Sequence, residues 1–212
     1  ACKDVFVEKP MALTLEDAEK MKKVAEETGR ILMVGHLLEF HPSVLKLRDI
    51  IASGELGKIN YIYSNRLNFG KVRTEENALW SFAPHDVAVI LRLMGQAPVE
   101  VSSSGGSYLT KGIADTTMSN LRFDDDSRAH IFVSWLHPYK EQRLVVVGDK
   151  KMAIFNDVAP FNEKLQLYPQ NVEFDGSMPL LKKEDAEFIG HANTEPLRDE
   201  CAHFLECIQT RQ

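Results

Sequence analysis

The sequence lacks the patterns that identify several classes of protein. Its 212 residues include only three cysteines, Cys2, Cys201 and Cys207, which cannot all pair within one chain. This excludes a secreted disulfide framework and favours the reducing cytoplasm. No signal peptide is visible. No CxxC or HExxH motif occurs, so we expect no metal site.

Long runs of basic residues and long runs of apolar residues are missing as well. The formal net charge is -6, from 25 Lys+Arg against 31 Asp+Glu, and no basic run occurs. Nucleic-acid binding requires clustered Lys and Arg, so we expect no nucleic-acid partner. The longest apolar stretches, such as residues 31–34 and 144–147, are far too short to cross a bilayer, which argues against a membrane partner.

The first 35 residues are predicted to form a βαβ unit. A short apolar strand leads into Glu8-Lys9-Pro10. Thr14 is typical of a helix N-cap, and Gly29 is a natural stop for the same helix. Residues 30–35 then form a second buried strand. Residues 1–35 are therefore predicted to be the end of a parallel α/β sheet.

Residues 36–212 have a different pattern. Pro42 predicts the start of one helix, and Pro84 predicts the start of a second helix that Gly95 ends. Pro196 predicts the start of a last helix. The apolar face expected for this last helix consists of Leu197, Cys201, Phe204, Leu205 and Ile208.

Strands dominate between the second and the last helix. Asp124-Asp125-Asp126 and Gly148-Asp149-Lys150 are turn signals, and each lies between two apolar runs and predicts a hairpin. The predicted strands are residues 59–68, 99–109, 116–123, 128–136, 142–147 and 152–155, with weaker candidates at 165–168 and 172–174. The fold class is therefore α+β, with a largely antiparallel open sheet covered by helices.

Glu8-Lys9-Pro10 is the first candidate for chemistry. It follows a parallel strand, and open α/β sheets bind their ligands at the carboxyl ends of their strands. A lysine at such a place acts as an acid or base when burial and a nearby positive charge lower its pKa. The alternative is a surface turn in which the lysine pairs with its neighbour.

The run from Ser81 to Asp86 is the second candidate. Pro84 in a first helical turn would place His85 and Asp86 at a helix N-terminus. His85 would then tend to stay neutral, which suits a proton relay, whereas Asp86 could be a capping acid. A capped helix with a structural histidine is the alternative.

Other polar residues are weaker candidates for binding. His36 follows the second strand, where it could line a site or simply pack. Arg66 and Arg73 flank the polar loop 69–77 and could hold a phosphate or carboxylate, although a solvated charged loop explains them as well. The glycine-rich dinucleotide fingerprint is absent, because Gly105-Gly106 follows no strand-to-helix turn. These residues alone therefore do not establish cofactor binding.

Taken in order, these motifs resemble one known family, the glucose-fructose oxidoreductase / inositol dehydrogenase / rhizopine catabolism family (Gfo/Idh/MocA). The matching segments are Glu8-Lys9-Pro10, Val34-Gly35-His36, Phe40-His41-Pro42, Leu79-Trp80-Ser81-Phe82-Ala83-Pro84-His85-Asp86 and Pro196-Leu197-Arg198-Asp199-Glu200-Cys201. The His-Asp helix with its preceding Trp80 resembles the nucleotide-sugar dehydrogenases most closely, especially those that oxidise the 3-hydroxyl of UDP-linked amino sugars.

The resemblance implies two domains. Residues 1–35 would be the end of a Rossmann-type dinucleotide-binding domain, and residues 36–212 an α/β domain for substrate binding and oligomerisation. It also implies that most of the first domain and a C-terminal tail lie outside this chain, so we expect the fragment itself to be inactive.

The family's functional residues can be carried over to this sequence. Lys9 matches the catalytic lysine, with Glu8 and Pro10 beside it near the nicotinamide ring of NAD or NADP. His85 matches the histidine that assists proton transfer from a sugar or nucleotide-sugar hydroxyl. Many members carry an aspartate four residues before this histidine, where this chain has Ser81. The residues expected to contact the substrate are His36, Arg66, Arg73, Trp80 and Asp86.

Two other functions are compatible with the sequence. The family also contains NAD-dependent glycosidases, which oxidise the sugar transiently, eliminate the aglycone and restore the cofactor. The chain could also be a non-catalytic module for oligomerisation and ligand binding. In the family the open sheet often makes the oligomer contact, which implies a homo-oligomer here.

Overall fold

The computed structural model describes residues 3–169, 171–182 and 184–211, so Cys2 lies outside the described residues. The chain divides into two compact units. The first comprises the chain up to Pro42 together with the segment from Asn193 onward, and the second runs from Ser43 to Ala192. The first unit therefore joins the two ends of the sequence.

The first unit contains the predicted βαβ arrangement. Strand β1 (Val5–Glu8) and strand β2 (Leu32–Gly35) pair in parallel, and helix α1 (Leu15–Thr28) connects them. Thr14 caps the helix by accepting a hydrogen bond from the backbone N–H of Asp17 at 3.1 Å. Gly29 ends it in the left-handed conformation, with φ of 61°. The prediction of a strand, a helix and a parallel strand is confirmed.

A last helix completes the first unit. Helix α4 (Pro196–Thr210) begins at Pro196 as predicted, and it packs against the short 3-10 helix η1 (Leu37–Phe40). The predicted apolar face is wrong for Leu197, Cys201 and Leu205, which are exposed. The helix is turned so that Glu200, an acidic residue, is buried instead. The residues of α4 that are at least partly buried are Pro196, Asp199, Glu200, Phe204, Cys207 and Ile208.

The second unit is built on a mixed sheet that has eight strands within the described residues, in the order β12-β9-β8-β7-β3-β6-β5-β4. Every neighbouring pair is antiparallel except β3 and β6. The strands are β3 (Ile59–Phe69), β4 (Glu100–Gly106), β5 (Thr116–Arg122), β6 (Arg128–Ser134), β7 (Leu136–Gly148), β8 (Lys151–Asn156), β9 (Leu165–Pro169) and β12 (Glu187–Phe188). This confirms the predicted largely antiparallel sheet. A separate hairpin consists of β10 (Asn171–Asp175) and β11 (Met178–Lys182).

Strand β3 lies at the centre of the sheet, between β6 and β7. Trp135 is the single residue between β6 and β7, so the chain crosses the end of β3 there. Trp135 is completely buried, and its Nε1–H donates to a carboxylate oxygen of Asp115 at 2.6 Å. The predicted strand 128–136 therefore ends two residues early, and Leu136 belongs to the next strand.

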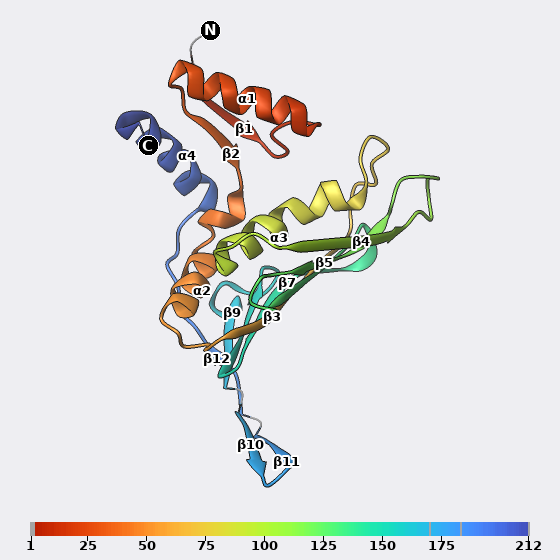
Figure 1. Ribbon diagram of the computed structural model, residues 1–212, viewed down its shortest axis with the longest axis vertical. Helices are drawn as coiled ribbons and strands as arrows, with labels where there is room; N and C mark the ends of the chain where they lie inside the picture. The colour runs from red at the N-terminus through yellow and green to blue at the C-terminus, as the bar shows by residue number, and fades with distance from the viewer. Residues whose placement is uncertain (1–2, 170, 183, 212) are drawn as a thin grey trace. The chain divides into compact units, whose positions relative to one another are not determined.

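Two helices belong to the second unit. Helix α2 (Pro42–Ala52) begins at Pro42 as predicted. Helix α3 (Ala78–Met94) packs against β3, β5 and β6 along one face of the sheet (Figure 1). The apolar core lies between α3 and this face. Its buried members include Ile62, Val89, Ile90, Leu93, Leu121, Ile131 and Val133.

The predicted start of α3 at Pro84 is wrong. The helix begins six residues earlier, because Asn77 is its N-cap and accepts a hydrogen bond from the backbone N–H of Trp80 at 3.1 Å. Pro84 lies inside the helix, where it has no N–H to donate. His85 and Asp86 are therefore not at a helix N-terminus. The positive end of the helix dipole, which was expected to keep His85 neutral and to favour Asp86 as a cap, does not lie beside them.

Candidate functional site

Two of the predicted site residues, Lys9 and His36, lie at the same edge of the first unit's sheet. The register of the parallel pair sets Glu8 opposite Gly35, so Lys9 and His36 are the residues that directly follow the two strands. Lys9 is half-buried, and the Lys9–Pro10 peptide bond is cis. Polar side chains at the carboxyl ends of adjacent parallel strands are well placed to meet a ligand.

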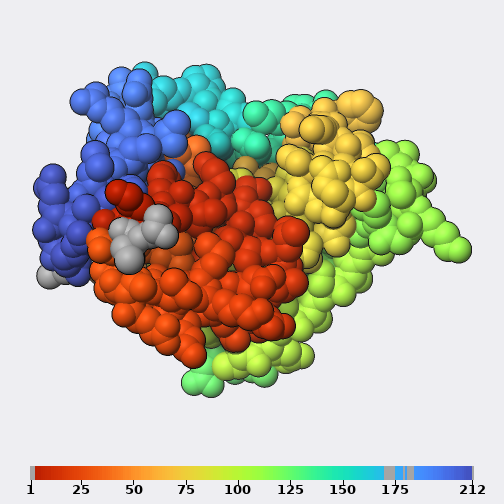
Figure 2. All heavy atoms as spheres, turned by 90° about the horizontal axis from the view of Figure 1, so that it is seen from above, coloured from red at the N-terminus to blue at the C-terminus, as the bar shows by residue number. Residues whose placement is uncertain are grey.

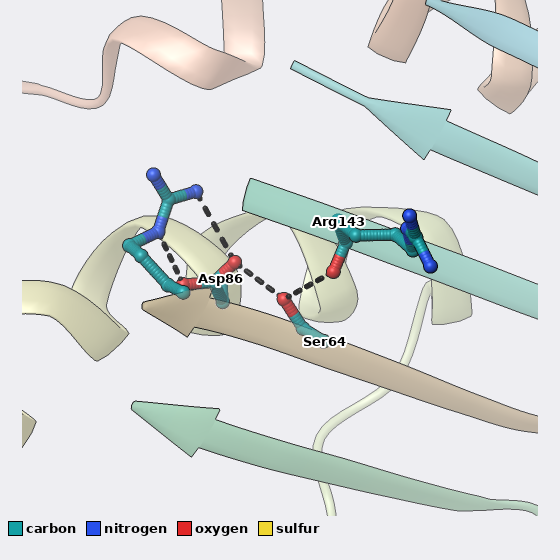
Figure 3. A network of polar contacts seen from close by, with 4 residues as sticks. Ser64, Asp86 and Arg143 are labelled. Carbon is teal, nitrogen blue, oxygen red and sulfur yellow. Dashed lines mark hydrogen bonds and ion pairs between the residues drawn. The ribbon is translucent and has the colours of Figure 1, made fainter. Parts of the chain in front are cut away.

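In the second unit, a buried ion pair joins α3 to the central strand. The guanidinium of Arg66 on β3 donates from Nε to Asp86 Oδ2 at 2.7 Å and from a terminal nitrogen to Oδ1 at 3.2 Å. The Ser64 hydroxyl donates to Asp86 Oδ1 at 2.6 Å, and it also lies 3.4 Å from the carbonyl oxygen of Arg143 (Figure 3). The Asp86 carboxylate thus accepts three hydrogen bonds from β3.

This network gives Arg66 and Asp86 a role that the sequence did not predict. Their side chains are only 10% and 4% exposed, so both charges are withdrawn from water. A buried charge is tolerated when it is paired and hydrogen-bonded, and the two-pronged contact provides both. Arg66 does not flank a solvated loop, and Asp86 is not a helix cap. Their function within the unit is to attach α3 to the sheet.

The remaining candidates on α3 follow from the helical repeat. His85 directly precedes Asp86 and is half-buried, while Trp80 is 52% exposed near the start of the helix. Ser81 and His85 are four residues apart and therefore share a face of the helix. Because Asp86 is fixed to β3, the direction in which His85 projects is fixed as well.

Two loops flank the first turn of α3. The loop 70–77 precedes the helix, and the loop 107–114 is tied to it by a hydrogen bond from Ala78 N–H to Ala114 O at 2.9 Å. The two loops lie side by side, as the yellow and light-green segments of Figures 1 and 2 show. Arg73 lies in the first of them, where its Nε contacts Glu76 at 2.9 Å.

Buried Asp115 holds the second loop in place. Its Oδ2 accepts the backbone N–H groups of Tyr108 at 2.6 Å and Leu109 at 2.9 Å, and its Oδ1 accepts the Trp135 indole. Burial alone would raise the pKa of Asp115, but these hydrogen bonds outweigh it and lower the pKa below its usual range. The charged Asp115 carboxylate therefore orients the loop beside α3 through these hydrogen bonds.

Sequence reasoning did not single out Ser64, Asp115 or Glu200, all of which are buried. Ser64 and Glu200 are polar residues at positions where the strand or helix pattern calls for an apolar one, whereas Asp115 lies in the bend before β5. Glu200, for example, lies one helical turn before Phe204 on the packed side of α4. A polar residue on a face that is expected to be buried was the signal that could have identified such a residue.

Two further properties concern the described residues only. No group of three or more His, Cys, Asp or Glu among them is arranged to hold a metal ion. None of their helices has the length and apolar character needed to cross a membrane.

Comparisons with known proteins identify the origin of both units. The profile of the GFO/IDH/MocA C-terminal domain matches residues 44–154. The profile of the oxidoreductase family with an NAD-binding Rossmann fold matches residues 1–36. The two matches follow one another along the chain and together account for β1 through most of β8.

Individual relatives point in the same direction. A 2,7-anhydro-N-acetylneuraminate hydratase from Mediterraneibacter gnavus is 28% identical over 161 residues, which are 69% of this chain and 43% of that protein. The UDP-N-acetylglucosamine 3-dehydrogenase of Acidithiobacillus ferrooxidans is 25% identical over 204 residues, which are 96% of this chain and 62% of that protein. The chain thus spans only about half to two thirds of the length of these two relatives.

Solved structures share the fold. That of the Acidithiobacillus ferrooxidans dehydrogenase matches with a TM-score of 0.81 at 23% identity, covering 99% of this chain and 64% of that chain. An inositol dehydrogenase homologue from Azotobacter vinelandii, solved with NADH and myo-inositol, matches with a TM-score of 0.71 at 17% identity, covering 96% of this chain and 63% of that chain.

Removing one partner of the buried ion pair should destabilise the protein strongly. Asp86→Ala leaves the Arg66 guanidinium buried without its counter-ion, and we expect a loss of about 3–5 kcal/mol in the free energy of unfolding. Urea denaturation followed by circular dichroism measures this loss.

Two controls accompany this measurement. Glu100 pairs with Arg122 on the same sheet at 3.0 Å, but that pair is exposed, so Glu100→Ala should cost less than about 1 kcal/mol. The double variant Arg66→Met/Asp86→Leu should regain most of the lost stability, because it removes both charges. Equal losses for Asp86→Ala and Glu100→Ala would contradict the proposed role of the buried pair.

Proposed function

Because the chain belongs to the Gfo/Idh/MocA family of oxidoreductases, we propose that the full-length protein transfers a hydride between a sugar and NAD or NADP. The reacting group of the sugar is a hydroxyl-bearing carbon. A nucleotide sugar is the first substrate to consider, since the related enzyme of Acidithiobacillus ferrooxidans is named for UDP-N-acetylglucosamine. In this proposal the unit with β1, α1 and β2 is part of the dinucleotide-binding domain, and the unit with the large sheet binds the sugar.

The observation that carries the proposal is the position of Lys9. It directly follows β1, at the edge of the parallel pair where open α/β sheets bind ligands. There the Lys9 amine can take the proton from the sugar hydroxyl while the carbon loses its hydride. A purely structural module would have no need of a half-buried lysine at this edge.

The side chains at this edge fit a nicotinamide ring. Lys9 and His36 supply polar groups, and the apolar pair Val7 and Val34 lies one residue before the last pair of the two strands. Both groups can hydrogen-bond a carboxamide. When bound, the nicotinamide accepts or returns the hydride, and the protein supplies orientation and proton transfer.

His85 is the second proton-transfer residue in the proposal. An imidazole changes its charge near physiological pH and can accept a hydroxyl proton. Substrate contacts are assigned to His36, Trp80 and Arg73, whose side chains offer an imidazole, an indole and a guanidinium. Arg66 and Asp86, also expected to contact the substrate, would act mainly by holding α3, because their charged groups are committed to each other.

A second candidate function is a reaction in which the cofactor is reduced and then reoxidised, so that no NADH accumulates. The relative from Mediterraneibacter gnavus is named as a hydratase, which supports chemistry of this kind. An NAD-dependent glycosidase would belong to the same class, because the sugar is oxidised only transiently. Accumulation of NADH favours the dehydrogenase, whereas sugar conversion without NADH favours this alternative.

Replacing Lys9 tests the proposed chemistry. In the full-length protein, Lys9→Met should abolish turnover, with a loss of at least about a hundredfold in kcat, while the dissociation constant for NAD(H) stays within a few-fold. Absorbance of the reduced nicotinamide measures turnover, and calorimetric titration measures cofactor binding.

Lys22→Met is the matched control, because Lys22 lies on the outer side of α1 with a side chain that is 73% exposed. It should retain wild-type turnover. If Lys9→Met retained turnover, Lys9 would have no part in proton transfer.

We propose that the protein is a cytoplasmic homo-oligomer assembled through the open face of its sheet. The cysteines Cys201 and Cys207 are free thiols, as is usual in a reducing compartment. On the face opposite α3, large apolar side chains remain accessible, including Tyr61 and Met118, each 41% exposed. An exposed apolar face of this kind supports an interface between subunits.

Sedimentation velocity of the full-length protein tests the assembly. We expect a dimer or larger species, and Met118→Glu should shift it toward monomer, because it buries a charge in the interface. Leu109→Glu is the control, since Leu109 is exposed in a loop away from this face. A wild-type protein that sediments as a monomer would reject the proposal.

A further inference from the structure

Two side-chain contacts connect helix α4 and the residue after it with strand β1 and the residue before it. The rings of Phe6 and Phe204 stack with centroids 5.4 Å apart. At one end of this stack, Arg211 donates to Asp4 Oδ1 at 2.8 Å. Asp4 and Phe6 are two residues apart, so they project from the same side of the strand. The chains of β1 and α4 therefore run in opposite directions along this contact.

The same spacing brings two glutamates together at the other end. Glu8 follows Phe6 by two residues, about 6.6 Å along the strand. Glu200 precedes Phe204 by about one turn, roughly 6 Å along the helix. The acidic group of Glu8 acts electrostatically on Glu200. The end of β1 that carries Glu8-Lys9-Pro10 is therefore faced by a second carboxyl group, supplied by the last helix.

The environment of Glu200 is unusual for a charged group. The residue is only 1% exposed. It accepts a hydrogen bond from the backbone N–H of His36, but its Oε1 is buried and has no hydrogen-bond partner among the described residues. Burying a carboxylate with one bare oxygen costs much more free energy than burying the neutral carboxylic acid.

Glu8 is held close to the same backbone segment. Its Oε2 lies 3.5 Å from the point where a Cβ on Gly35 would be, so the carboxylate is folded over that glycine. Gly35 and His36 are adjacent, and thus the Glu8 and Glu200 carboxyl groups approach neighbouring residues at the end of β2. Two ionised carboxylates in such an arrangement would repel each other.

The titration of Glu200 agrees with this geometry. Burial is the largest influence and raises the pKa of Glu200, the His36 N–H opposes it, and the charge of Glu8 raises it further. The titratable groups on neighbouring elements, within the described part of this unit, are Glu8 on β1, Lys9 after it, His36 after β2, and Glu39 and His41 on and after η1. Those on α4 itself are Arg198, Asp199, Cys201, His203, Glu206 and Cys207.

We propose that Glu200 is a positioning residue for the Glu8-Lys9-Pro10 motif. Because its buried carboxyl group is uncharged, it does not repel the Glu8 carboxylate, which keeps its place over Gly35. Lys9, the next residue, then keeps its place at the end of β1. A charged Glu200 would drive the Glu8 carboxylate away from Gly35 and displace Lys9 with it. This inference rests on the proposed function of Lys9.

The direct test is a titration that requires no activity. In full-length protein with ¹³C-labelled glutamate carboxyl groups, the Glu200 resonance is identified by its absence from Glu200→Gln. We expect Glu200 to titrate above the ordinary value of 4.5 and to be still protonated at the pH at which turnover is measured. We also expect Glu8→Gln to lower its midpoint. A Glu200 that is ionised at that pH, or a midpoint that Glu8→Gln leaves unchanged, would overturn the inference.

Turnover of two further variants separates positioning from simple packing. Glu200→Leu keeps the site filled and apolar, so the fold should persist, but kcat should fall roughly tenfold or more because Glu8 and Lys9 shift. Glu200→Gln reproduces the neutral acid and should restore most of the loss. Full turnover in Glu200→Leu would show that Glu200 only packs. A full-length protein with no turnover at all, but with the expected titration, would instead count against the proposed function.

Discussion

The ion pair between Arg66 and Asp86 is the interaction on which the second unit depends. Both groups are buried, and each would be costly without the other. Their two-pronged contact is possible only in one alignment of α3 on β3, whereas apolar packing tolerates small slides and rotations. The pair therefore determines where His85 and Trp80 lie on the helix, and Ser64 completes the arrangement from the same strand. The same ion pair therefore contributes to the stability of the second unit and to the geometry of its candidate site residues.

The first unit obeys a different constraint. Its short parallel strands bring Lys9 and His36 to one edge, and α4 closes over the other elements through the Phe6–Phe204 stack. This arrangement places an acidic residue, Glu200, in an interior position of a small unit. A buried acid is acceptable when it is neutral. Burial raises the pKa of Glu200, which favours this neutral form on the packed side of the helix.

Much of this could be predicted from the sequence, for identifiable reasons. Thr14 and Gly29 mark a helix by local hydrogen bonding, and the turn at Asp124-Asp125-Asp126 marks a hairpin, so both were found. The start of α3 was not, since Pro84 is a stronger local signal than Asn77, and a proline inside a helix is tolerated only because tertiary packing outweighs its cost. The pairing of Arg66 with Asp86 joins residues twenty apart, and no local pattern indicates it. For the same reason the face of α4 was misjudged, because the partner that buries Glu200 lies at the opposite end of the chain.

The proposed transfer of a hydride between a sugar carbon and a nicotinamide can be followed with an isotope. The full-length protein is incubated with NAD or NADP and a set of deuterated sugars and nucleotide sugars, beginning with UDP-N-acetylglucosamine deuterated at C3. Mass spectrometry of the reduced cofactor is the measurement. We expect deuterium from the sugar carbon to appear in the nicotinamide ring. Reduced cofactor that carries no deuterium, or binding of both ligands with neither reduction nor conversion of any sugar, would contradict it.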